Sequence, residues 1–134
     1  MDLPTNVIIA NTLATGTVYL MDDGIFINGK SHYAIIINKT ITPSSPILLV
    51  VVTSQIAKRK QYIANANLSS DTLVYTSPSE CGFLSIPSVV DCNTVLERSI
   101  DEIIKKIENN DITATFEVPN YLLEKIRYGV LKSR

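Results

Sequence analysis

The sequence predicts an α+β protein, mainly β, in which a small bent antiparallel sheet or barrel carries two C-terminal helices. Apolar, β-branched segments with strand character occupy the chain up to residue 95, whereas helical periodicity appears only from residue 99 onward. This order, strands first and helices last, favours an antiparallel sheet with helices at one side over alternating strand–helix units with a parallel sheet. A length of 134 residues suits a single domain spanning residues 1–134.

Apolar and β-branched runs bounded by turn signals predict the extended segments. These segments are residues 16–20, 32–38, 47–52, 72–76, 82–86 and 88–95. Asn28-Gly29 is a strong hairpin signal, so residues 24–30 are expected to form an excursion before the second segment. Two stretches stay open: residues 7–9 fit an edge strand or a short helix, and residues 54–62 fit a helical turn or a loop.

Two helices are predicted near the C-terminus. Isoleucines at positions 100, 103, 104 and 107 fall on one helical face. Ser99 and Glu102 have the spacing of a capping box, and the polar residues 109–111 are expected to end this helix. A second amphipathic stripe is entered through Pro119-Asn120, and it consists of Leu122, Leu123, Ile126 and Val130.

Composition narrows the class of function. A net charge of −1 disfavours a protein that coats nucleic acid nonspecifically. The longest apolar run, residues 47–52, is far shorter than the roughly 20 residues that span a bilayer, so no membrane association is expected. Without a secretory signal, Cys81 and Cys92 are expected to be free thiols in a reducing cytoplasm. One histidine and two distant cysteines do not suggest a metal site, and no cofactor motif is present.

The candidate site lies at the ends of two predicted strands. His32, the only histidine, opens one strand, and Thr53, Ser54 and Gln55 close the next. If these strands pair as an antiparallel hairpin, the histidine and the hydroxyl groups meet at the same edge. Histidine exchanges protons near neutral pH, and a hydroxyl group can hydrogen-bond a phosphoryl oxygen. The alternatives are a packing or surface role for His32 and turn chemistry for the Thr-Ser pair.

Charged residues near this edge complete the candidate set. Lys58, Arg59 and Lys60 follow the hydroxyl pair directly, and a cation there can neutralise charge that develops in phosphoryl transfer. The alternative is a solvated cationic turn. Asp91 lies in a later extended segment, where it can instead cap or pair with a neighbour.

The order of segments resembles the PemK/MazF family of bacterial toxin ribonucleases. Segments 16–20, 32–38, 47–55, 83–93, 99–107 and 120–132 follow the family order, and the sharpest part is Val51-Val52-Thr53-Ser54-Gln55 after an apolar strand. The resemblance implies an SH3-like barrel with appended helices, a homodimer, and a small antitoxin protein as partner. It also implies metal-independent cleavage of single-stranded RNA by the substrate's 2′-hydroxyl, leaving a cyclic phosphate and a 5′-hydroxyl.

The resemblance assigns roles to some residues and departs from the family at one. The family's catalytic hydroxyl maps onto Thr53, with Ser54 beside it, and an acidic residue of some members maps loosely onto Asp91. The family's catalytic arginine falls on His32, which can transfer protons but cannot act as a permanently charged bidentate clamp. Arg59 is the candidate replacement for that charge. The alternative function is a catalytically inactive barrel that binds protein or RNA.

Overall fold

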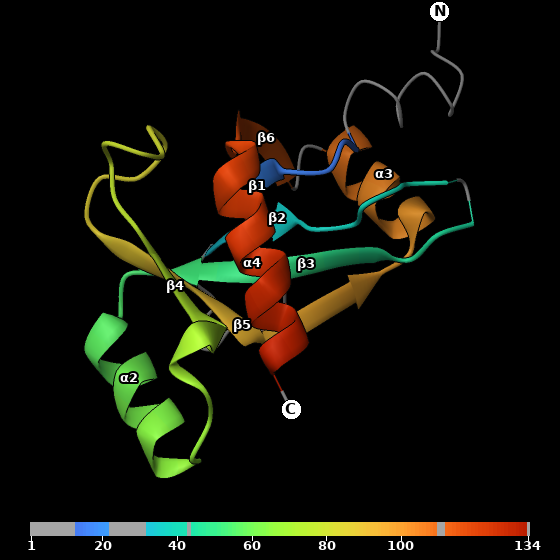
Figure 1. Ribbon diagram of the computed structural model, residues 1–134. Helices are drawn as coiled ribbons and strands as arrows, with labels where there is room; N and C mark the ends of the chain where they lie inside the picture. Colours follow the sequence, from blue (N-terminus) through green and yellow to red (C-terminus); the bar gives the residue numbers. More distant parts are fainter. Residues whose placement is uncertain (1–12, 22–31, 43, 110–111, 134) are drawn as a thin grey trace, which may run out of the picture.

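The computed structural model describes residues 13–21, 32–42, 44–109 and 112–133. These residues form an α+β fold with a curled six-stranded antiparallel sheet and three α-helices (Figure 1). The α+β class, the bent antiparallel sheet and the two C-terminal helices are as the sequence predicts, whereas the helix before them was left open. The expected element at residues 7–9 and the excursion at residues 24–30 lie outside the described residues. Within the described part of the chain, no helix is long and apolar enough to cross a membrane.

The sheet has the strand order β4-β5-β3-β2-β1-β6, and every neighbouring pair is antiparallel. Its strands are β1 (Thr17–Met21), β2 (His32–Ile36), β3 (Ile47–Thr53), β4 (Leu73–Thr76), β5 (Ser88–Arg98) and β6 (Ile112–Glu117). The helices are α2 (Ile56–Asn65), α3 (Ile100–Glu108) and α4 (Asn120–Lys132), and the short 3₁₀ helix η2 (Ser70–Thr72) precedes β4. Because β4 and β6 both end the order, the curled sheet is an open half-barrel with two edges.

Helices cover both faces of the sheet, not one side as the sequence suggested. Val50 and Val52 of β3 belong to a core cluster with α4, whereas Leu49 and Val51 belong to a cluster with α3. In Figure 1, α4 crosses one face of the sheet. The uninterrupted apolar run of β3 is the sequence counterpart of this arrangement, because a strand covered on both faces needs apolar residues at every position.

The local predictions have mixed outcomes. The capping box of Ser99 and Glu102 is confirmed at the start of α3, and the open stretch at residues 54–62 is mostly helical, in α2. The predicted extended segment at residues 82–86 is wrong: it consists of a turn and bends, with Leu84 N–H donating to the carbonyl of Cys81. Strand β6 was missed, although its sequence, ITATFE, is rich in β-branched and aromatic residues.

Strand β5 carries a bulge where it meets β3. Val50 pairs with Val95 but Val51 pairs with Asp91, so β5 advances four residues (91 to 95) while β3 advances one (50 to 51). Residues 92–94 of β5 are therefore outside this ladder. A bulge bends a strand and redirects its side chains. The pairing of β5 with β4 also ends at the bulge, with the Leu73–Asp91 pair.

Both cysteines are free, as predicted, and both are buried. Burial raises the pKa of the Cys92 thiol to about 12, and burial also raises the pKa of Cys81. Cys92 Sγ lies in the bulge of β5 and contacts the Ile126 carbonyl of α4 at 3.5 Å. The Cys92 thiol therefore acts as a protonated packing group where α4 crosses the sheet.

Gly129 allows α4 to approach this bulge closely, and we expect Gly129→Ala to lower the free energy of unfolding by about 2 kcal/mol. A Cβ at this position would lie 2.7 Å from Cys92 Sγ and 2.8 Å from the backbone oxygen of Asp71. This overlap outweighs the gain of up to about 1 kcal/mol in helix propensity. Urea unfolding checks the expectation. Gly82→Ala is the control because the nearest atom, on Phe116, is 3.9 Å away; equal stability of the two variants would contradict it.

Candidate functional site

The ends of β2 and β3 meet as the sequence predicts. The two strands are antiparallel, and the register runs from Ile36–Leu49 to Tyr33–Val52. Strand β2 begins at His32 and β3 ends at Thr53, which are the next positions beyond the Tyr33–Val52 pair. The hairpin register therefore brings the histidine and the threonine hydroxyl to the same end of the sheet.

A pocket of about 300 Å³ opens at this end. Four of the predicted site residues line it: His32, Thr53, Ser54 and Gln55. The rest of its wall comes from the neighbouring strands and from the loop before β5, and consists of Tyr33, Val52, Phe83, Leu84, Ser85, Ile86 and Ser88. The volume is at the lower end of the range for small-molecule sites.

The Thr53 hydroxyl is held in place by the turn that follows β3. Its Oγ1 accepts a hydrogen bond from the Gln55 backbone N–H at 3.2 Å, and Thr53 is 7% exposed. This is the local side-chain-to-backbone bond that Thr and Ser favour where a strand ends. Ser54 and Gln55 are exposed, and His32 is half-buried. The Thr53 hydroxyl group that accepts this hydrogen bond in the turn is therefore the same group that the sequence nominates to contact a phosphoryl oxygen.

An aromatic group forms one side of the pocket. The rings of Tyr33 and Phe83 lie 4.7 Å apart between centroids at 61°, and Phe83 lies 5.2 Å from Phe116 of β6. Sequence reasoning missed this group because Phe83 was assigned to an extended segment and β6 was not predicted. Aromatic side chains beside polar groups are typical of surfaces on which unpaired bases stack.

The basic run does not line this pocket. Lys58, Arg59 and Lys60 all lie in α2, and Lys58 and Lys60 are exposed. The Lys60 ammonium lies 5.6 Å from the centroid of the Tyr75 ring on β4. Arg59 instead forms an ion pair with Asp91, with 3.1 Å between Nη1 and Oδ2. Among the described residues that line the pocket, none is a lysine or an arginine.

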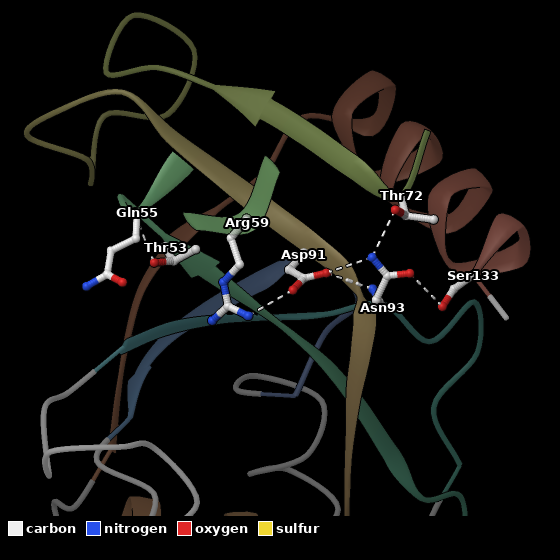
Figure 2. Close-up of polar contacts among 7 residues, drawn as sticks. All are labelled: Thr53, Gln55, Arg59, Thr72, Asp91, Asn93 and Ser133. Carbon is white, nitrogen blue, oxygen red and sulfur yellow. Dashed lines mark hydrogen bonds and ion pairs between the residues drawn. The ribbon is translucent and has the colours of Figure 1, made fainter. Parts of the chain in front are cut away.

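Asp91 does not line the pocket and belongs to a polar network, which is drawn in Figure 2. It is 3% exposed, and besides Arg59 it accepts hydrogen bonds from the backbone N–H and side-chain amide of Asn93. The Asn93 amide also donates to Thr72 Oγ1, and its oxygen accepts from the Ser133 hydroxyl. The network therefore joins α2, the β5 bulge, η2 and the end of α4. Asn93 was not singled out in the sequence, which carries no local signal for these long-range bonds.

The site thus consists of an imidazole, hydroxyl and amide groups, and an aromatic wall. Such a set can exchange protons and hydrogen-bond an anionic oxygen. No cluster of three or more His, Cys, Asp or Glu side chains suited to a metal ion occurs within residues 13–21, 32–42, 44–109 and 112–133. Comparison with known proteins finds no matching family model and no matching curated protein.

Proposed function

We propose that the protein is a metal-independent endoribonuclease that cleaves single-stranded RNA by attack of the substrate's own 2′-hydroxyl. The observation that carries this proposal is the shared pocket of His32 and Thr53 beside the aromatic pair of Tyr33 and Phe83. Because the substrate supplies its own nucleophile, the protein needs to provide only proton transfer, charge stabilisation and positioning. The pocket offers groups for each of these tasks.

In the proposed reaction the 2′-oxygen forms a bond to phosphorus and the bond from phosphorus to the 5′-oxygen breaks. His32 transfers one of the two protons, either from the 2′-hydroxyl or to the leaving 5′-oxygen, and solvent water exchanges the other. Thr53 and Ser54 donate hydrogen bonds to the phosphoryl oxygens, and Gln55 contacts the nucleotide. Tyr33 and Phe83 hold a base by stacking. The products are a 2′,3′-cyclic phosphate and a 5′-hydroxyl.

The wider proposal is a PemK/MazF-like toxin: an SH3-like barrel that acts in the cytoplasm as a homodimer and is inhibited by an antitoxin protein. Its support is the order of segments in the sequence together with a curled antiparallel sheet. The Thr53-Ser54-Gln55 motif ends β3 within the pocket, which is where the resemblance assigns the catalytic hydroxyl.

A second candidate function is RNA or protein binding without cleavage. The pairing of Arg59 with Asp91 favours it, because the cation nominated to replace the family's arginine already has a carboxylate partner. Without a permanent cation in the pocket wall, charge on the pentacoordinate phosphorus must be met by hydrogen bonds and protonated His32. These two candidates differ in one observable, the cleavage of a bound RNA.

A cleavage assay with two matched RNAs tests the proposal. Purified protein, in buffer containing EDTA, is incubated with an unstructured RNA of mixed sequence and with the same RNA carrying 2′-O-methyl groups throughout. We expect cleavage of the first only, with cyclic phosphate and 5′-hydroxyl ends. Binding of both RNAs without cleavage would replace the enzyme proposal with the binding module, and cleavage of the methylated RNA would contradict the 2′-hydroxyl mechanism.

A further inference from the structure

A second groove lies between the edge of the sheet and α4, and it shares no lining residue with the His32 pocket. Its volume is about 560 Å³. One wall comes from η2 and β4 and the other from α4, and the lining residues are Ser70, Asp71, Leu73, Val74, Tyr75, Tyr121, Glu124, Lys125 and Tyr128. The groove therefore follows an edge strand along its length.

The backbone of β4 presents hydrogen-bonding groups to this groove. The Leu73 N–H donates to the Ser70 carbonyl of η2 and so points away from β5. In an antiparallel strand, residues alternate between those whose N–H and C=O both face the partner and those for which both face away. Tyr75, two residues on, must therefore direct its N–H and C=O outward from the sheet. Since β4 ends the strand order, no strand pairs with it on that side in the described part of the chain.

Tyrosines make the groove suited to protein contacts. Tyr75, Tyr121 and Tyr128 all line it, and they are 48%, 49% and 52% exposed. The Tyr121 hydroxyl is held by a hydrogen bond to Glu80 Oε2 at 2.7 Å, and the Lys132 ammonium lies 5.3 Å from the Tyr128 ring centroid. Tyrosine is enriched at protein interfaces because its ring supplies rigid apolar area and its hydroxyl tolerates water.

We propose that this groove binds an extended peptide segment of a partner protein, which adds to the sheet as a strand beside β4. The backbone of the peptide would pair with the outward N–H and C=O of Tyr75, and alternate side chains would pack against Tyr121 and Tyr128. Strand addition of this kind takes affinity from main-chain hydrogen bonds and specificity from side-chain pockets. The inference is independent of RNA cleavage at the other pocket.

The charges and the shape of the groove distinguish a peptide from other occupants. Asp71 and Glu124 place carboxylates in the lining and Lys125 places one ammonium there, so the groove does not attract a polyanion such as RNA. A second copy of this chain fits poorly, because a two-fold contact would set one concave groove against another and fill neither. An extended peptide can fill the groove and also satisfy the strand edge.

A selection with phage-displayed random decapeptides on the 134-residue chain tests the proposal. We expect the selection to enrich peptides with alternating apolar residues. When these peptides are synthesised, their Kd for the Tyr128→Ala variant should be at least about tenfold higher than for the wild-type protein. Tyr75→Ala and Tyr75→Pro both remove the ring, but only proline also removes the outward N–H. The proline variant should therefore bind more weakly than the alanine variant, and edge strands tolerate proline at such positions. Tyr62→Ala is the control, since Tyr62 is 54% exposed and does not line the groove.

Hydrogen exchange is measured on the wild-type protein, so its result does not depend on whether a variant folds correctly. The bound peptide should slow exchange of the Tyr75 amide. Failure to enrich any peptide, equal binding to the Tyr128→Ala variant, or no protection of Tyr75 would overturn the proposal. If an RNA decamer protects the Tyr75 amide, the groove binds RNA and the peptide proposal is wrong. If the amide is protected without peptide and sedimentation detects self-association, the groove binds a second copy of the chain and the proposal is equally wrong.

Discussion

Asp91→Ala is expected to lower the free energy of unfolding by about 3 kcal/mol, because it removes the acceptor at the centre of a buried network. Asp91 is 3% exposed, and it pairs with Arg59 and accepts hydrogen bonds from the backbone N–H and the side-chain amide of Asn93. Truncation leaves the Asn93 backbone N–H without its acceptor and removes the counter-ion of Arg59. Asp91→Asn should cost about half as much, since it keeps an oxygen for Asn93 and loses only the charge. Urea unfolding measures both variants.

The same variants separate a structural role of Asp91 from a role in RNA binding. Since Asp91 does not line the His32 pocket, the folded Asp91→Asn protein should cleave RNA within about threefold of wild type. Arg59→Ala should destabilise the protein because it leaves a buried carboxylate without its counter-ion, whereas Lys58→Ala, at an exposed neighbour on α2, should not. Normal stability together with lost cleavage in Asp91→Asn would contradict the structural role and place Asp91 in the site.

The parts of the fold that the sequence predicts are those with short-range causes. The capping box at Ser99 and Glu102 fixes the start of α3 within four residues, and the Thr53 hydroxyl bonds to a backbone group two residues away. The hairpin joining His32 to Thr53 also follows from one turn and two apolar runs. The first two pairs are at most three residues apart, and a single turn brings the third pair together, so the pattern of residue types is sufficient.

The parts that the sequence leaves undetermined depend on contacts between distant segments. Arg59 and Asp91 are 32 residues apart, and the bulge that contains Asn93 is defined only by the pairing of β5 with the distant β3. The aromatic wall of the pocket needs Tyr33 and Phe83, which are 50 residues apart and which tertiary packing brings together. A basic run beside a hydroxyl motif therefore suggested a phosphate site, while the tertiary structure uses its middle residue as an ion-pair partner.

The largest functional effect is expected from His32→Ala. In the proposed mechanism His32 is the proton-transfer group, and loss of a general acid or base typically reduces the rate by about 10²–10⁴-fold. Single-turnover cleavage of the unstructured RNA measures this loss, and RNA binding by the catalytically impaired protein should change much less. His32→Gln, which keeps polar atoms but transfers no proton at neutral pH, should be as impaired as the alanine variant.

Thr53 can be tested with two substitutions of similar size, because they separate its hydroxyl from its shape. Thr53→Val removes the hydroxyl, and Thr53→Ser keeps it while removing a methyl group. We expect Thr53→Val to reduce cleavage by about 10²-fold, as for removal of one donor to a developing oxyanion, and Thr53→Ser to retain most activity. Ser85→Ala is the control for a hydroxyl elsewhere in the same pocket wall. The His32→Ala, Thr53→Ala double variant decides the assignment: cleavage equal to wild type would show that the reaction occurs elsewhere on the protein.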